Sequence, residues 1–200
     1  MQLLVATRNR NKVAEIRAML KDAEFDVLSA TTVRGLPEVV EDAGTIRENA
    51  IKKAVETAKA AGMLTIADDS GLEVDALGGE PGVRSARFAG EKATYHENNK
   101  KLMKLLESVP SGKRAARFRC VVAIADATGL IDTVEGICNG MLIEAERGGG
   151  GFGYDPLFIP DGQVKTFAEL SPDVKNRISH RAKAIQKAWA VLSRYQRERS

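Results

Sequence analysis

The chain has 200 residues, of which 44% are hydrophobic and 28% charged, as is typical of a folded globular protein. No run approaches the roughly 20 consecutive apolar residues of a membrane-spanning helix, and the first residues lack the pattern of a signal peptide. The composition therefore excludes a membrane-embedded protein and predicts a cytoplasmic one with no membrane partner.

The net charge of +3 is small, but the charges are unevenly distributed along the chain. Residues 38–75 carry nine acidic and four basic side chains, whereas residues 175–199 carry eight basic and one acidic. This division suits a metal ion held by carboxylates, facing cations that bind phosphate. A solvated helix face also explains a basic run, so charge alone leaves both interpretations open.

The first third of the chain predicts strands and helices separated by polar loops. In chain order these are a strand over 2–6, a polar loop over 7–12, a helix including 13–20, a strand over 25–30, an irregular acidic loop over 34–44, a helix over 46–61 and a buried strand over 64–67. Thr45 and Glu48 have the capping-box spacing of a helix start, and Gly62 is a typical helix stop.

The rest of the chain predicts a central hairpin between helices. In order the elements are a helix over 94–109 with Leu102, Leu105 and Leu106 inward, a hairpin of 115–126 with 130–145, a strand over 157–159, short helical turns, and a helix from about Ser179 with Ile185, Trp189 and Leu192 on one face. No linker or repeat marks independent domains, so residues 1–200 are interpreted as a single mixed α/β domain.

The two cysteines, Cys120 and Cys138, lie in apolar stretches without metal-binding spacing, so reduced core thiols are the favoured interpretation. The predicted hairpin would place them roughly opposite each other. A disulfide would then be geometrically possible, although it is not expected in the cytosol.

Asp68 and Asp69 follow the apolar strand 64–67 and are expected to form an acidic turn with Ser70 and Gly71. Two adjacent carboxylates near a core are costly unless a cation or hydrogen bonds compensate them. A Mg²⁺ ion held by a few carboxylate oxygens and by substrate phosphates is one solution. The alternative is that Asp68 caps the turn and Asp69 is solvated.

The loop before the first helix is a natural anion site, because free helix amides point outward and Thr7, Asn9 and Lys12 add donors. It is not a Walker A loop, since it lacks the glycines and the Lys-Ser/Thr ending. The side chains of Arg8 and Arg10 either join this site or face solvent.

Glu41 lies in the irregular acidic loop without an evident structural duty, which makes it the better candidate for a second carboxylate ligand. Glu48 is favoured as a helix cap over a metal neighbour. On the same helix, at most one of Lys52 and Lys53 can face the same cleft as Glu48 or Asn49.

Gly148, Gly150 and Gly153 satisfy GxGxxG, but no strand leads into them and no helix opens after them, so the dinucleotide-binding interpretation fails. The loop instead brings Phe152 and Tyr154 to a surface, where a ring either stacks on a base or packs under the loop.

The start of the last helix gathers polar donors at Ser179, His180 and Arg181. His96 is expected to be a surface residue. Neither histidine suggests a Ser-His-Asp nucleophilic set.

Five motifs in series resemble the inosine triphosphate pyrophosphatase family over nearly the whole chain. They are Thr7-x-Asn9-x-x-Lys12, Glu48-Asn49-Ala50-x-x-Lys53-Ala54, Ala67-Asp68-Asp69-Ser70-Gly71-Leu72, Gly151-Phe152-Gly153-Tyr154-Asp155-Pro156 and Ser179-His180-Arg181. The resemblance implies a Mg²⁺-dependent homodimer that hydrolyses ITP, dITP or XTP to the monophosphate and pyrophosphate. It also implies an elongated two-lobed fold, with a central mixed sheet flanked by helices and the active site in the cleft between the lobes.

The resemblance also assigns roles to individual residues. Asp69 is implied as the general base that also touches the metal, Glu41 as a metal ligand and Ser70 as a substrate contact; the role of Asp68 stays open. The loop residues Thr7, Arg8, Asn9, Arg10, Asn11 and Lys12, with Lys53, are implied to bind the triphosphate. The base pocket is implied to consist of Phe152, Gly153, Tyr154, Asp155, Lys175, His180 and Arg181, with Phe152 as the stacking ring.

Two other functions compete with this one. A Maf-like pyrophosphatase would make the same cut in pyrimidine or modified nucleotides. A nucleic-acid-binding module would use the basic C-terminal helix and bind in a salt-sensitive way. The aromatic content of only 5% argues against a stacking platform for nucleic acid.

Overall fold

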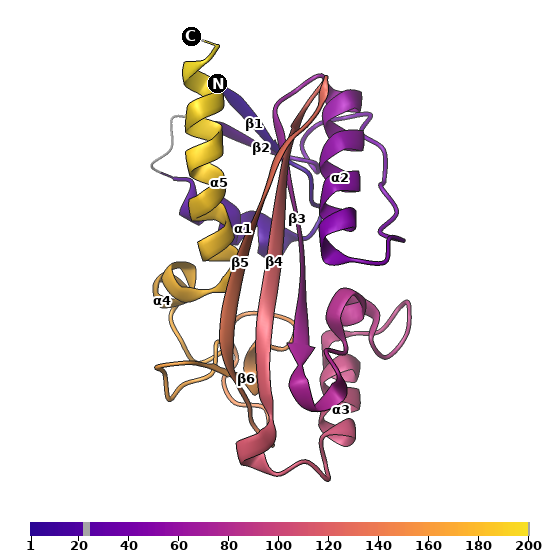
Figure 1. Cartoon of the computed structure of the whole chain (residues 1–200), viewed down its shortest axis with the longest axis vertical. Coiled ribbons are helices and arrows are strands. Elements are labelled where there is room, and N and C mark those ends of the chain that lie inside the picture. The colour runs from indigo at the N-terminus through magenta and orange to yellow at the C-terminus, as the bar shows by residue number, and fades with distance from the viewer. Residues whose placement is uncertain (22–24, 200) are drawn as a thin grey trace. The chain divides into compact units, whose positions relative to one another are not determined.

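A computed structural model describes residues 1–21 and 25–199 (Figure 1), and within them six strands form one sheet in the order β2-β1-β3-β4-β5-β6. The strands are β1 (Gln2–Val5), β2 (Asp26–Ser29), β3 (Thr65–Val74), β4 (Ala115–Asp126), β5 (Gly129–Leu142) and β6 (Phe158–Pro160). The α-helices are α1 (Arg10–Met19), α2 (Ile46–Ala61), α3 (Tyr95–Leu105), α4 (Pro172–Ile178) and α5 (His180–Arg197). β1 pairs in parallel with β2 and β3, whereas β5 and β6 are antiparallel, so the predicted mixed α/β class is confirmed.

The chain divides into two compact units. The first consists of Met1–Asp69, Cys120–Gly136 and Arg181–Ser200, and the second of Ser70–Arg119 and Ile137–His180. β3, β4 and β5 each contribute residues to both units. Among the described residues, no helix is both long and apolar enough to cross a membrane.

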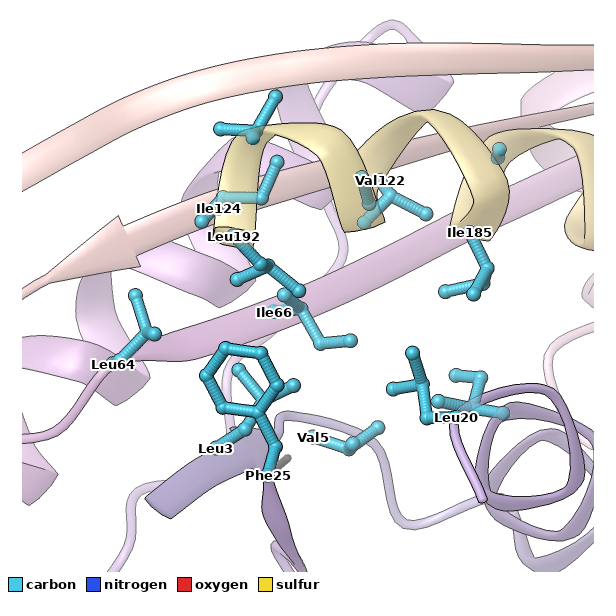
Figure 2. Close-up of a cluster of buried hydrophobic side chains, with 14 of the residues drawn as sticks. Leu3, Val5, Leu20, Phe25, Leu64, Ile66, Val122, Ile124, Ile185 and Leu192 are labelled. Carbon is cyan, nitrogen blue, oxygen red and sulfur yellow. The ribbon is translucent and has the colours of Figure 1, made fainter. Parts of the chain in front are cut away.

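The core of the first unit lies between its strands and the helices α1 and α5. Ile185 and Leu192 of α5 point toward Ile66 of β3, with Val5 and Leu20 close by (Figure 2). Each such side chain contributes about 1.5–3 kcal/mol when it is fully buried. The predicted apolar face of α5 is therefore confirmed.

α2 covers the opposite side of the strands in the first unit (Figure 1), where Ala50, Ala54 and Ala58 are fully buried. Its predicted bounds are confirmed. The Thr45 hydroxyl oxygen accepts a hydrogen bond from the Glu48 amide at 3.1 Å, which caps the start of the helix. Gly62 ends it in a left-handed conformation with φ of 64°.

The second unit has its own hydrophobic cluster, in which the Phe118 ring packs edge-on against Phe158 with centroids 4.8 Å apart. Leu102 and Leu106 of the α3 segment are buried there as predicted. Leu105 is 44% exposed, so its predicted inward position is wrong. The two buried leucines are four residues apart and share a face, whereas Leu105 lies beside that face.

Two other expectations are corrected by the structure. The acidic segment 68–71 is not a turn, because β3 continues through it to Val74. β5 ends at Leu142 rather than at 145. The predicted short helical turns before the last helix are α4, and α5 begins at His180, in agreement with the predicted start at about Ser179.

Cys120 and Cys138 are both buried and free, as expected for core thiols. Their predicted placement opposite each other is wrong, since Cys120 belongs to the first hydrophobic cluster and Cys138 to the second. Cys120 lies six residues before the end of β4, whereas Cys138 lies nine residues after the start of β5. The unequal distances from the turn separate the two thiols.

Asp126, at the hairpin turn, should make the stability of the fold depend on pH. Its carboxylate accepts hydrogen bonds from the Thr128 hydroxyl at 2.5 Å and the Tyr195 hydroxyl at 2.7 Å. The Thr128 hydroxyl is the largest of several causes that lower the pKa of Asp126 to about 2. The ionised carboxylate therefore stabilises the fold above pH of about 4, and this stabilisation is lost as the pH falls through about 2.

We therefore expect Asp126→Asn to lower the melting temperature at pH 7 by about 2–4 °C, the effect of losing one hydrogen bond. The difference from wild type should shrink between pH of about 4 and 2, as followed by circular dichroism melts. Asp132→Asn, at a half-exposed position 3.9 Å from Arg194, is the control. A difference that stays constant with pH would contradict the assignment.

Candidate functional site

The loop between β1 and α1 is ordered by its own side chains. The Asn9 side-chain oxygen accepts hydrogen bonds from the amides of Asn11 at 3.0 Å and Lys12 at 3.3 Å. Arg8, Arg10 and Asn11 are exposed, and Arg8 donates to the carbonyl of residue 36. Lys12 is the cation of this loop that reaches a buried partner.

That partner is Asp68, which also binds Arg181. One carboxylate oxygen of Asp68 lies 3.1 Å from Lys12 Nζ and 3.1 Å from Arg181 Nε. The same guanidinium binds Glu15 at 2.5 Å, and Asp68 and Arg181 are each only 1% exposed. Asp68 therefore orients two cations. The alternative prediction, that Asp68 caps a turn, is wrong because Asp68 lies within a strand.

The charges of this cluster stabilise one another. Burial by itself raises the pKa of Asp68, but the cations Lys12, Arg181 and Lys53 outweigh it and hold that pKa well below its usual range. Burial, the largest single cause, likewise lowers the pKa of Lys12, but the carboxylates of Asp68, Asp69 and Glu41 together outweigh it, so the net shift is upward. Both groups stay charged at neutral pH.

Lys53 of α2 lies near two further carboxylates, those of Glu41 and Asp69. Its ammonium lies 2.7 Å from Glu41, 2.7 Å from the backbone carbonyl oxygen of Asp68 and 4.0 Å from Asp69. The neighbouring Lys52 instead binds Asp42 at 2.6 Å, in a more exposed position. The prediction that at most one of the two lysines faces inward is consistent with this arrangement, and Lys53 is that lysine.

Asp69 differs electrostatically from Asp68. Burial is the main cause that raises its pKa, and the nearby carboxylates of Glu41 and Asp68 add to the effect. Lys53 and Lys12 oppose it without cancelling it. A carboxylate with a raised pKa is suited to accept a proton near neutral pH.

Glu41 and Asp69 present hard oxygen atoms toward a common cation, the Lys53 ammonium. One further oxygen, Oδ1 of Asp68, is buried without a hydrogen-bond partner. The described residues contain no group of three or more potential metal-ligating side chains of the Asp, Glu, His and Cys types. Mg²⁺ characteristically uses one or two carboxylates and completes its shell with water and phosphate oxygens, so this donor set fits it.

In the second unit, Asp155 organises the loop that carries Phe152. Its carboxylate accepts hydrogen bonds from the Phe152 amide at 2.8 Å and from Lys175 Nζ at 2.5 Å. The Lys175 ammonium also lies 4.8 Å from the centroid of the half-buried Phe152 ring. The Asn99 side chain donates to the Gly153 carbonyl at 3.1 Å. The structure thus brings together four predicted residues of the base pocket.

Tyr154 and His180 of the same unit are buried. The Tyr154 hydroxyl donates to the Ser85 carbonyl at 2.9 Å, and burial raises its pKa. The sequence left open whether this ring stacks on a base or packs under the loop. In the structure the Tyr154 ring packs under the loop. His180 stacks on Phe118 with centroids 4.7 Å apart, whereas His96 is exposed as predicted.

Residues 3–191 match the model of a family described as the Ham1 family. The chain belongs to the Ham1 family. The dITP/XTP pyrophosphatase of Desulforamulus reducens is 53% identical over 194 residues, covering 97% of this chain and 96% of that protein. The dITP/XTP pyrophosphatase of Bacillus licheniformis is 48% identical, with 96% and 97% covered.

Solved structures of Ham1 proteins have the same fold. The HAM1 protein of Coxiella burnetii superposes with a TM-score of 0.86 at 37% identity, covering 97% of this chain and 99% of that one. The Ham1 protein of Staphylococcus aureus has a TM-score of 0.85 at 36% identity, covering 96% and 98%. The resemblance to the inosine triphosphate pyrophosphatase family is thereby confirmed.

Arg181, which the family resemblance assigns to the base pocket, binds Asp68 and Glu15 in the first unit through its guanidinium. Its partners lie 113 and 166 positions away, so no local pattern indicates them. Glu15 was missed, although its spacing of three residues from Lys12 puts both on one helix face.

Proposed function

We propose that this Ham1 protein hydrolyses non-standard purine nucleoside triphosphates, namely ITP, dITP and XTP, to the monophosphate and pyrophosphate. Such an activity removes deaminated purines from the nucleotide pool. The observation that carries the proposal is the buried Asp69, whose pKa is raised beside Lys12 and Lys53. The names of the two bacterial relatives support the substrate class and the pyrophosphatase activity.

In the proposed reaction, Asp69 accepts a proton from a water molecule while the water oxygen bonds to the α-phosphorus. The bond between the α-phosphorus and the bridging oxygen breaks, and pyrophosphate leaves with that electron pair. Lys12 and Lys53 neutralise the charge that develops on the phosphate oxygens. When bound by Glu41 and Asp69, Mg²⁺ supplies further charge neutralisation at the phosphates.

The other predicted contacts are proposed as substrate-binding groups. Ser70 contacts the substrate, and the loop residues Thr7, Arg8, Asn9, Arg10 and Asn11 bind the triphosphate with Lys12. Arg181 is now proposed to hold Asp68 rather than a base.

The base is proposed to stack on Phe152, within reach of groups from Gly153, Tyr154, Asp155, Lys175 and His180. Donors in this set would face the 6-keto oxygen of hypoxanthine or xanthine. The 6-amino group of adenine would leave such donors unpaired, at about 1–3 kcal/mol for each.

Pyrophosphate release from a nucleotide panel tests the function. We expect ITP, dITP and XTP to be hydrolysed much faster than ATP, dTTP and UTP. Comparable rates on dTTP or UTP would favour the Maf-like alternative. Salt-sensitive DNA binding without pyrophosphate release would favour a nucleic-acid-binding module.

The metal assignment predicts that Glu41→Gln raises the Mg²⁺ concentration needed for half-maximal activity by at least about tenfold. Calorimetric Mg²⁺ binding without substrate gives a second readout. Asp42→Asn is the matched control, because this carboxylate lies in the same loop, is 65% exposed and binds Lys52 instead. Equal Mg²⁺ requirements in both variants, or activity that persists in a chelator, would contradict the metal site.

The assembly and the location are proposed on the family resemblance: a homodimer in the cytoplasm. Light scattering coupled to gel filtration should give about twice the chain mass of 21.6 kDa. A monomeric mass would refute the dimer.

A further inference from the structure

Ser85 connects separate segments of the second unit through hydrogen bonds from both its side chain and its backbone. It is buried within the 3₁₀ helix Gly82–Arg87. Its hydroxyl oxygen accepts from the Leu72 amide at 2.8 Å, and the hydroxyl donates to the Gly82 carbonyl at 2.6 Å. Its own carbonyl accepts from the Tyr154 hydroxyl at 2.9 Å.

The Leu72 end of this network lies on the strand that carries the proposed chemistry. Leu72 is two residues after Ser70 and three after Asp69, all within β3. A Cβ atom at Gly71 would meet the Gly82 carbonyl and come within 2.9 Å of the Ser85 hydroxyl oxygen. The close approach of Ser85 to β3 therefore depends on the glycine between Ser70 and Leu72.

The Tyr154 end lies in the loop assigned to the base. Tyr154 stands between Gly153 and Asp155, two residues after Phe152. Its ring is buried in the hydrophobic cluster, so its hydroxyl acts as an anchor. Ser85 is therefore hydrogen-bonded to the loop that carries Phe152, two residues beyond that ring.

The Ser85 segment is itself attached to α3. The Asn98 side chain accepts from the Ala89 amide at 2.7 Å and donates to the Ala86 carbonyl at 3.1 Å. Asn98 is 2% exposed, so water does not compete readily for these bonds. Ser85 is thus held at a fixed position between β3 and the Phe152 loop.

We propose that Ser85 is a positioning residue, which holds the Phe152 loop in register with the part of β3 around Ser70 and thereby sets the discrimination between purine bases. This inference rests on the proposed function. It adds a residue that touches neither the base nor the phosphates in that scheme.

The test compares kcat and KM for ITP and ATP in wild type, Ser85→Ala and Tyr154→Phe. Ser85→Ala leaves the buried Leu72 amide without its acceptor, and we expect KM for ITP to rise and the ITP-to-ATP ratio of kcat/KM to fall, each by about tenfold. Tyr154→Phe removes one oxygen atom and keeps the ring. It should lower the same ratio, with a larger change in KM than in kcat.

Thr65→Val is the matched control. It removes another buried hydroxyl, which donates to the Met63 carbonyl at 3.0 Å near the start of β3, and is expected to change the melting temperature without changing the ratio. If the Ser85 and Tyr154 variants have lower melting temperatures but keep the wild-type KM and ITP-to-ATP ratio of kcat/KM, the inference is overturned and the proposed function is not. A wild-type protein that releases no pyrophosphate from ITP would overturn the proposed function and the inference with it.

Discussion

Asp69→Asn is expected to lower the rate of pyrophosphate release from ITP by roughly 10²- to 10⁴-fold, the usual contribution of a positioned general base. Asparagine has nearly the same shape, but its amide cannot take the proton from the attacking water. It also weakens the ligand set proposed with Glu41. Single-turnover measurements at saturating Mg²⁺ would isolate the chemical step from metal binding.

The fold of this variant should be retained, because an uncharged side chain removes the repulsion between Asp69 and the carboxylates of Asp68 and Glu41. Asp42→Asn makes the same chemical change in an exposed carboxylate and should keep near-normal activity. Near-normal activity in Asp69→Asn would refute its role as the base. Loss of activity in both variants would show that the change of charge, rather than the site, is responsible.

Arg181→Ala should lower the free energy of unfolding by about 3–5 kcal/mol, because it removes one partner from a buried charge cluster. Asp68 would keep Lys12, while Glu15 would lose the guanidinium that lies 2.5 Å away. The alanine would also leave space where the arginine side chain packs. Urea denaturation followed by circular dichroism measures the loss.

Arg194→Ala is the matched control on the same helix. Arg194 is 59% exposed and lies 3.9 Å from Asp132, so its loss should cost about 1 kcal/mol or less. Equal losses in the two variants would contradict the buried cluster. A changed ITP-to-ATP ratio without a loss of stability would return Arg181 to the base pocket.

Among the site residues, the sequence allowed those in local motifs to be chosen as candidates. Helix geometry limited Lys52 and Lys53 to one inward-facing side chain, and the family resemblance chose Lys53. Glu41 was chosen because its loop gave it no structural duty. The partner of Arg181 was not predictable, because Arg181 and Asp68 are 113 positions apart and meet only through the packing of α5 beside β3. The role of Ser85 was likewise not predictable, since its partners come from β3 and a distant loop.

The sequence by itself determined those helix ends that are set by residues adjacent in the chain. Thr45 and Gly62 are examples, because a cap and a left-handed glycine act within one helical turn. Only the tertiary structure decided that β3 runs through Asp68 and Asp69, since adjacent carboxylates remain in a buried strand only when cations from other elements reach them. Lys12, Lys53 and Arg181 meet this requirement from three different helices, and the chain topology, not any local pattern, brings them together.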